Sequence, residues 1–100
     1  MKDESLRTIL DLDRMVHEPA RLAILTVLSA AEDVEFLFLL KVTGLSKGNL
    51  SAQAQKLEAA GYVQTIKGFR GRIPVTRFRL TDEGRRALAA YQSQMRALLS

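Results

Sequence analysis

The fold is decided by residues 43–61, which read TGLSKGNLSAQAQKLEAAG. Gly44 can take the positive φ that ends one helix, and the hydroxyl of Ser46 can cap the start of the next. Gly61 suits the position just after a helix. Residues 47–60 place apolar side chains at spacings of four and three, on one helical face: Leu50, Ala54 and Leu57. The stretch therefore predicts a tight turn between two helices, the second of which runs over 47–60.

The opposite face of this second helix is small and polar. It carries Gly48, Ser51, Ala52 and Gln55, with Lys47, Asn49 and Lys56 on its flanks. Such residues are ordinary on a solvated helix. They also leave the backbone approachable, which suits a helix that contacts a partner.

The segment before the turn is apolar on every side. Residues 36–40 read FLFLL, and periodicity alone cannot separate a strand from a buried helix here. We predict a short helix over 36–43 because it leads into the turn. A strand of one or two residues is expected just before it, at Val34 and Glu35.

Two further helices are expected nearer the N-terminus. Pro19 suits the first turn of a helix, because its missing N–H would be unpaired there, and it begins a predicted helix over 19–30. Residues 5–16 are predicted to form an amphipathic helix, with apolar residues at roughly helical spacing: Leu6, Ile9, Leu10, Met15 and Val16.

After Gly61 the pattern changes to that of strands. Residues 62–67 are rich in strand formers, and side chains alternate over 75–80. Between them lies the turn FRGRIP at 69–74. Pro74 cannot donate to a strand ladder, so it belongs at the tip or at an edge. The sequence predicts a hairpin over 62–80.

The last predicted helix covers 82–99. Thr81 can cap it, and the carboxylate of Asp82 suits the positive end of the helix dipole. Its apolar residues follow a three-four-three spacing: Leu88, Tyr91, Met95 and Leu98. That spacing fits a seam with another helix, and it fits equally a stripe that covers the chain's own core.

Positive charge is concentrated in one part of the chain. Residues 36–81 hold eight basic side chains and one acid, Glu58, whereas the whole chain has a formal net charge of +4. An anionic partner is expected, and nucleic acid is the commonest for small proteins of this kind. A solvated basic surface is the simpler alternative.

Composition limits the classes of function. One hundred residues, 47% of them apolar, suffice for a single domain over 1–100. Without cysteine, and with His17 as the one histidine, no catalytic triad or metal site can be assembled, so no enzyme, metal or cofactor is expected. We expect a cytoplasmic protein that is not inserted in a membrane, because no apolar run is long enough to span one.

Four strings carry a family resemblance: Leu45-Ser46-Lys47-Gly48-Asn49-Leu50-Ser51, Leu57-Glu58-Ala59-Ala60-Gly61-Tyr62-Val63, Lys67-Gly68-Phe69-Arg70-Gly71-Arg72 and Leu80-Thr81-Asp82-Glu83-Gly84-Arg85. In this order they resemble the small bacterial and archaeal winged helix-turn-helix regulators, kin to the MarR and ArsR groups, over residues 12 to about 90. The resemblance implies a mainly α fold with a small β hairpin, a three-helix core and flanking terminal helices. It also implies a homodimeric transcriptional regulator that binds double-stranded DNA.

The resemblance implies roles for individual residues. In the major groove, Asn49, Ser51 and Gln55 would read bases, and Ala52 would touch a thymine methyl. Lys47 and Lys56 would bind phosphates. Arg70 and Arg72 would reach the minor groove or its phosphates, while Arg77 and Arg79 extend the basic surface or form surface ion pairs. The dimer interface would use residues of both terminal helices: Leu6, Ile9, Leu10, Leu88, Tyr91, Met95 and Leu98.

Two other functions are compatible with the sequence. The same fold can serve as a protein-interaction module without specific DNA binding. A small-molecule effector, of a kind that the sequence does not identify, is compatible with DNA binding, and Phe38, Tyr91 and Met95 would line its crevice. Metal sensing, found in part of the ArsR group, is not expected here.

Overall fold

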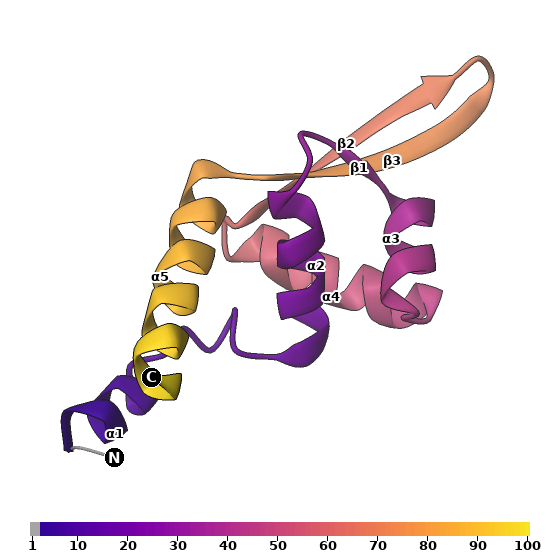
Figure 1. Cartoon of the computed structure of the whole chain (residues 1–100). Helices are drawn as coiled ribbons and strands as arrows, with labels where there is room; N and C mark the ends of the chain where they lie inside the picture. Colours follow the sequence, from indigo (N-terminus) through magenta and orange to yellow (C-terminus); the bar gives the residue numbers. More distant parts are fainter. Residues whose placement is uncertain (1–2) are drawn as a thin grey trace.

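The computed structural model describes residues 3–100, which form five helices and three strands (Figure 1). In chain order these are α1 (Asp3–Leu10), α2 (Pro19–Ser29), β1 (Val34–Glu35), α3 (Phe36–Thr43), α4 (Lys47–Ala59), β2 (Val63–Arg70), β3 (Ile73–Leu80) and α5 (Asp82–Leu99). The expected fold class is confirmed: the chain is mainly helical, with a small antiparallel sheet. Among residues 3–100, no helix is both long enough and apolar enough to cross a bilayer.

The core is built from the apolar faces of the helices and the inner side of the sheet. Its buried side chains are all hydrophobic among the residues whose burial is described. Leu50, Ala54 and Leu57 of α4 point into it, as their spacing predicts. The largest fully buried side chains are Ile24, Leu25, Leu28, Leu39, Leu50, Leu57 and Val16. Because the core fixes this face of α4, it also fixes the face that α4 turns outward.

Local capping signals hold α4 and α5 in place. Gly44 has φ 70° and ends α3, and the Ser46 hydroxyl accepts a hydrogen bond from the backbone N–H of Asn49 at 3.1 Å. At the start of α5, the Thr81 hydroxyl accepts from the backbone N–H of Gly84 at 3.0 Å. The side-chain oxygens thus satisfy N–H groups that the first turn of a helix leaves unpaired.

The sheet has the strand order β1-β3-β2 and is antiparallel. The hairpin spans the predicted residues, but its turn is shorter than the predicted 69–74, because Phe69 pairs with Pro74 and the turn is only Gly71-Arg72, with Gly71 at φ 64°. Pro74 lies beyond the short β1, which pairs with β3 only at Arg77 and Phe78, so its missing N–H interrupts no ladder on that side. The hairpin projects away from the helices as the wing (Figure 1).

The helix predicted over 5–16 is wrong at its C-terminal end, because α1 ends at Leu10. Beyond it the carboxylate of Asp13 accepts hydrogen bonds from the backbone N–H groups of Met15, at 2.8 Å, and Val16, at 3.3 Å. The same carboxylate accepts from the Tyr62 hydroxyl. This hydrogen bond, together with burial, raises the pKa of Tyr62 to about 12. Asp13 therefore stabilises a turn at a point where the spacing of apolar residues in the sequence predicted that the helix would continue.

Candidate nucleic-acid interface

The outward face of α4 is available to a partner. Core packing on one side leaves eight positions of α4 exposed: Lys47, Gly48, Asn49, Ala52, Gln55, Lys56, Glu58 and Ala59. Ser51 differs from the expectation, because it is half-buried. Gly48 has open space around its Cα, since an added Cβ would meet no atom within 4 Å. The backbone of the first turn of α4 is thus accessible.

A groove of about 260 Å³ separates α4 from the sheet. Ser51 and Gln55 line it from α4, and Lys67 lines it from β2. Glu58, the one acid in residues 36–81, also borders this groove, and its carboxylate accepts a hydrogen bond from the backbone N–H of Thr65 at 3.1 Å. Lys67 was counted in the basic stretch but not predicted as a site residue, and the register of β2 brings it beside two predicted base readers.

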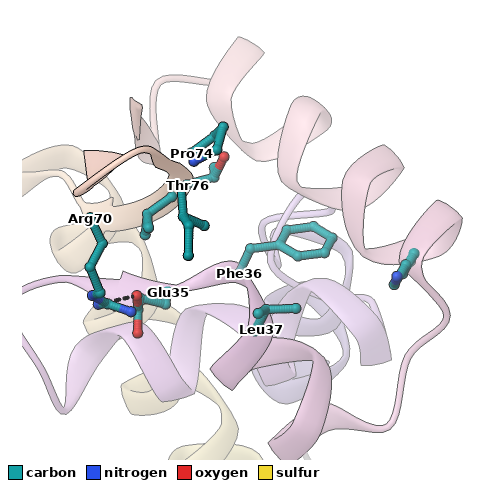
Figure 2. A pocket seen from close by; sticks show the side chains of 9 residues that line it. Glu35, Phe36, Leu37, Arg70, Pro74 and Thr76 are labelled. Atoms are coloured by element: carbon teal, nitrogen blue, oxygen red, sulfur yellow. Dashed lines mark hydrogen bonds and ion pairs between the residues drawn. The ribbon is translucent and has the colours of Figure 1, made fainter. Parts of the chain in front are cut away.

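A second hollow, of about 380 Å³, lies between the start of α4 and the wing (Figure 2). Lys47 contributes from α4, Arg70 from β2, and Pro74 and Thr76 from β3, while Phe36 and Leu37 form the opposite side. The structure therefore brings Lys47 and Arg70 to one hollow. Lys56 and Arg72 line neither of these two hollows, since they lie in the last turn of α4 and at the wing turn.

Arg70 of the wing forms an ion pair with Glu35. Its guanidinium donates to the carboxylate of Glu35 at 2.6 Å, and Figure 2 shows it reaching from the wing to β1. No acid lies near Arg70 in sequence, but Glu35 is 35 residues away and reaches it because β1 pairs with β3. Arg70 stays 65% exposed, so it remains accessible to a second anion.

The other wing arginines divide between the two expected roles. Arg79 donates to the carboxylate of Asp33 at 2.7 Å, so the ion-pair alternative holds for it. Arg77 is half-buried opposite Glu35 in the β1–β3 register. Arg72 is exposed at the wing turn. No carboxylate among the described side chains lies within ion-pair distance of Arg72, Lys47 or Lys56.

Comparison with known proteins decides the family. Residues 20–99 match the model of the winged helix DNA-binding domain. The chain belongs to this family. It is a family of DNA-binding domains rather than of enzymes.

Relatives agree with this assignment of the winged-helix domain. Uncharacterized protein MJ0432 of Methanocaldococcus jannaschii is 34% identical over 79 residues, covering 78% of this chain and 85% of that protein. The structure of a transcriptional regulator homologue from Pyrococcus horikoshii OT3 is 30% identical, with a TM-score of 0.87 over 96% of this chain and 94% of that one. A MarR-family regulator from Silicibacter pomeroyi shares the fold, with 21% identity and a TM-score of 0.69 over 94% of this chain and 62% of that chain.

The residues predicted for a dimer interface separate into two groups in the winged-helix domain. Leu6, Ile9 and Leu10 are exposed on α1, which packs against α5. In contrast, Leu88 and Tyr91 are buried in the core of the chain itself, which favours the alternative that their spacing covers the chain's own core. Met95 and Leu98 are partly buried against that core, while Leu99, which was not predicted, is 80% exposed.

The crevice expected for an effector is not a single site. Tyr91 borders a hollow of about 320 Å³ with His17, Glu18, Pro19 and Leu22, whereas Phe38 lines a different hollow beside Val34 and Val42. The Tyr91 hydroxyl and Nδ1 of His17 are hydrogen-bonded at 2.7 Å. The N-cap of α2 is Glu18, whose carboxylate accepts from the N–H groups of Ala20 and Arg21.

Proposed function

We propose that this winged-helix domain binds double-stranded DNA sequence-specifically as a homodimeric transcriptional regulator. In this proposal α4 enters the major groove and the wing contacts the adjacent minor groove or backbone. The observation that carries it is the exposed, small and polar face of α4, flanked by Lys47 and Lys56, neither of which lies within ion-pair distance of a described carboxylate. A face of this kind admits close approach of a duplex and presents hydrogen-bonding groups to base edges.

Phosphate contacts would supply most of the affinity. Five of the seven basic side chains on α4 and the wing are candidates for phosphate contact: Lys47, Lys56, Arg70, Arg72 and Arg77. If each neutralises one phosphate, the logarithm of affinity should fall with the logarithm of salt concentration with a slope of about −4 to −5 per protomer. Arg70 can contribute fully only where phosphate competes with Glu35.

The dimer would be built on the terminal helices. Leu6, Ile9, Leu10 and Leu99 expose apolar surface on α1 and on the end of α5, where the two helices lie together (Figure 1). Adjacent exposed apolar side chains favour association with a matching surface. Two-fold symmetry would then place two copies of α4 on half-sites about one helical turn, or a multiple of it, apart.

An interaction module without DNA binding is the second candidate. The observation that favours it is the exposure of Leu37, Phe38 and Val42 on α3, at 70%, 52% and 48%. Exposed apolar side chains of this kind mark sites of protein contact in many proteins. Phe38 and Val42 line a hollow together with Val27 of α2, whereas Leu37 lines the hollow that also holds Lys47, so a protein bound to this surface would reach the start of α4.

Selection from a pool of random duplexes tests the proposal. We expect the full chain to enrich a sequence with two related half-sites, and Lys47→Ala to weaken binding to all duplexes alike. Arg86→Ala is the matched control, because it removes the same charge from an exposed position on α5. Failure to bind any duplex at low salt would contradict the proposal and favour the interaction module.

A further inference from the structure

Arg21 of α2 is held beside the middle of α4 by several hydrogen bonds. Its Nε donates to the backbone carbonyl of Met15 at 2.8 Å, and one Nη donates to that of Arg14 at 3.3 Å. The other Nη donates to Oε1 of Gln53 at 2.8 Å and lies 3.8 Å from the carboxylate of Glu18. The side chain is only 13% exposed, so its guanidinium has a fixed place and direction.

This fixed guanidinium determines which way the Gln53 amide points. A guanidinium carries donors and no acceptor, so the Gln53 atom that faces Arg21 must be the oxygen. The Nε2 group of Gln53 therefore faces the other way, where it donates to Oδ1 of Asn49 at 3.1 Å. Gln53 and Asn49 are one helical turn apart on α4, which is the separation that lets two such side chains meet.

The same logic then determines the orientation of Asn49. Its oxygen must face Gln53, because Gln53 presents a donor to it, and its Nδ2 group is left on the side away from Gln53. Asn49 is exposed in the first turn of α4, the part of a recognition helix that contacts base edges. The hydrogen bonds from Arg21 to Gln53 and from Gln53 to Asn49 thus determine which end of the Asn49 amide faces a partner of α4.

We propose that Arg21 and Gln53 are positioning residues that make Asn49 read DNA as a hydrogen-bond donor. This inference rests on the proposed function. A donor selects the acceptors of the major groove, which are guanine O6 and N7, thymine O4 and adenine N7. A bidentate contact of Asn49 with adenine would need both Oδ1 and Nδ2 to face the base, whereas Oδ1 faces Gln53.

Gln53→Glu keeps the hydrogen bond from Arg21 and reverses the direction of the hydrogen bond with Asn49. The new carboxylate still accepts from Arg21 but cannot donate to Asn49, so Asn49 must turn its Nδ2 group inward and present Oδ1 to DNA. We expect the variant to gain affinity for cytosine and to lose affinity for guanine or thymine at one position of each half-site, because cytosine offers only an amino donor whereas guanine and thymine offer only acceptors. The change in relative affinity should be about fivefold, the value of one net hydrogen bond.

The added charge in this variant needs a matched control. Ala59→Glu introduces the same charge at an exposed position in the last turn of α4, away from the amide chain. It should lower affinity for all duplexes and leave base preference unchanged. If Gln53→Glu also leaves every base preference unchanged relative to Ala59→Glu, the inference is overturned.

Side-chain amide exchange in the free protein tests the orientation without DNA. In the wild type, NMR should show slower exchange for the Nε2 protons of Gln53 than for the Nδ2 protons of Asn49, and Gln53→Glu should slow the latter. The reverse order in the wild type would overturn the amide orientation. The exchange pattern can agree with the proposed orientation while selection from random duplexes shows no sequence preference. That combination would overturn the role of Asn49 in reading DNA, and it would count against the proposed function itself.

Discussion

The guanidinium of Arg70 and the carboxylate of Glu35 form an ion pair at 2.6 Å that joins the wing to β1. Both side chains remain partly exposed, at 65% and 37%. An exposed pair of this kind contributes at most about 1 kcal/mol to stability, so its effect on the fold is small. Its effect on the affinity for phosphate should be larger, because Glu35 competes with a DNA phosphate for the guanidinium of Arg70.

Replacing Glu35 should therefore strengthen DNA binding. Glu35→Gln frees Arg70 and removes a negative charge from the hollow shared with Lys47. We expect tighter binding at low salt and a salt slope steeper by about one. Asp33→Asn is the control, since it frees Arg79 and removes the same charge away from that hollow. Equal effects of the two variants, measured by fluorescence anisotropy, would refute a specific role for the Glu35–Arg70 pair.

Gly48 and Gly84 should respond in opposite ways to alanine. Gly48→Ala adds a methyl group in open space within α4, so it should raise the free energy of unfolding by up to about 1 kcal/mol. In our account the same methyl group obstructs close approach of a duplex, so DNA affinity should fall. A Cβ at Gly84 would overlap the backbone carbonyl oxygen of Tyr62, and Gly84→Ala should cost about 3 kcal/mol. Urea unfolding and duplex titration measure both effects, and unchanged affinity of Gly48→Ala would argue against groove insertion.

Leu10 tests the dimer. It is 74% exposed at the end of α1, so a charge there should not disturb the core. We expect Leu10→Glu to give a monomeric mass by sedimentation and to weaken binding to a two-half-site duplex more than to a single half-site. Val42→Glu is the control, because it places a charge at an exposed apolar residue on α3, outside the hollow that holds Lys47 and Arg70. A dimer that survives Leu10→Glu but not Val42→Glu would move the interface to α3.

Tyr62 should make stability depend on pH in the alkaline range. Its pKa is raised to about 12, chiefly by the hydrogen bond that the neutral hydroxyl donates to Asp13. The stabilisation is therefore fully present below the ordinary pKa of 10.0 and is lost as pH rises through about 12. Tyr62→Phe should cost about 1 kcal/mol at neutral pH, since the pair is partly solvated. Urea unfolding should show this difference shrinking above pH 10.0, and a constant difference would disprove the assignment.

Local chemistry made much of the fold predictable. Gly44, Ser46 and Thr81 act within a few residues of their own positions, so the boundaries that they set could be derived from the sequence. The same holds for the outward face of α4, because Leu50 and Leu57 fix the inner one. Such signals do not depend on how distant segments pack.

Features that depend on distant contacts could not be derived. The end of α1 reflects the turn at Asp13, whose carboxylate also meets Tyr62, 49 residues away in sequence. The partner of Arg70 comes from pairing of β1 with β3, and the orientation of Asn49 depends on Arg21 of another helix. The spacing of Leu88 and Tyr91 fits a seam or a core equally well, and only packing decides between them.

The proposed DNA binding requires that α4 and the wing form one surface. Titrating the 15N-labelled chain with the duplex chosen by selection tests this directly. We expect the largest changes in backbone amide chemical shift over residues 47–56 and 70–73, with residues 86–96 of α5 little changed. Changes confined to α1 and α5, or no changes at low salt, would contradict it.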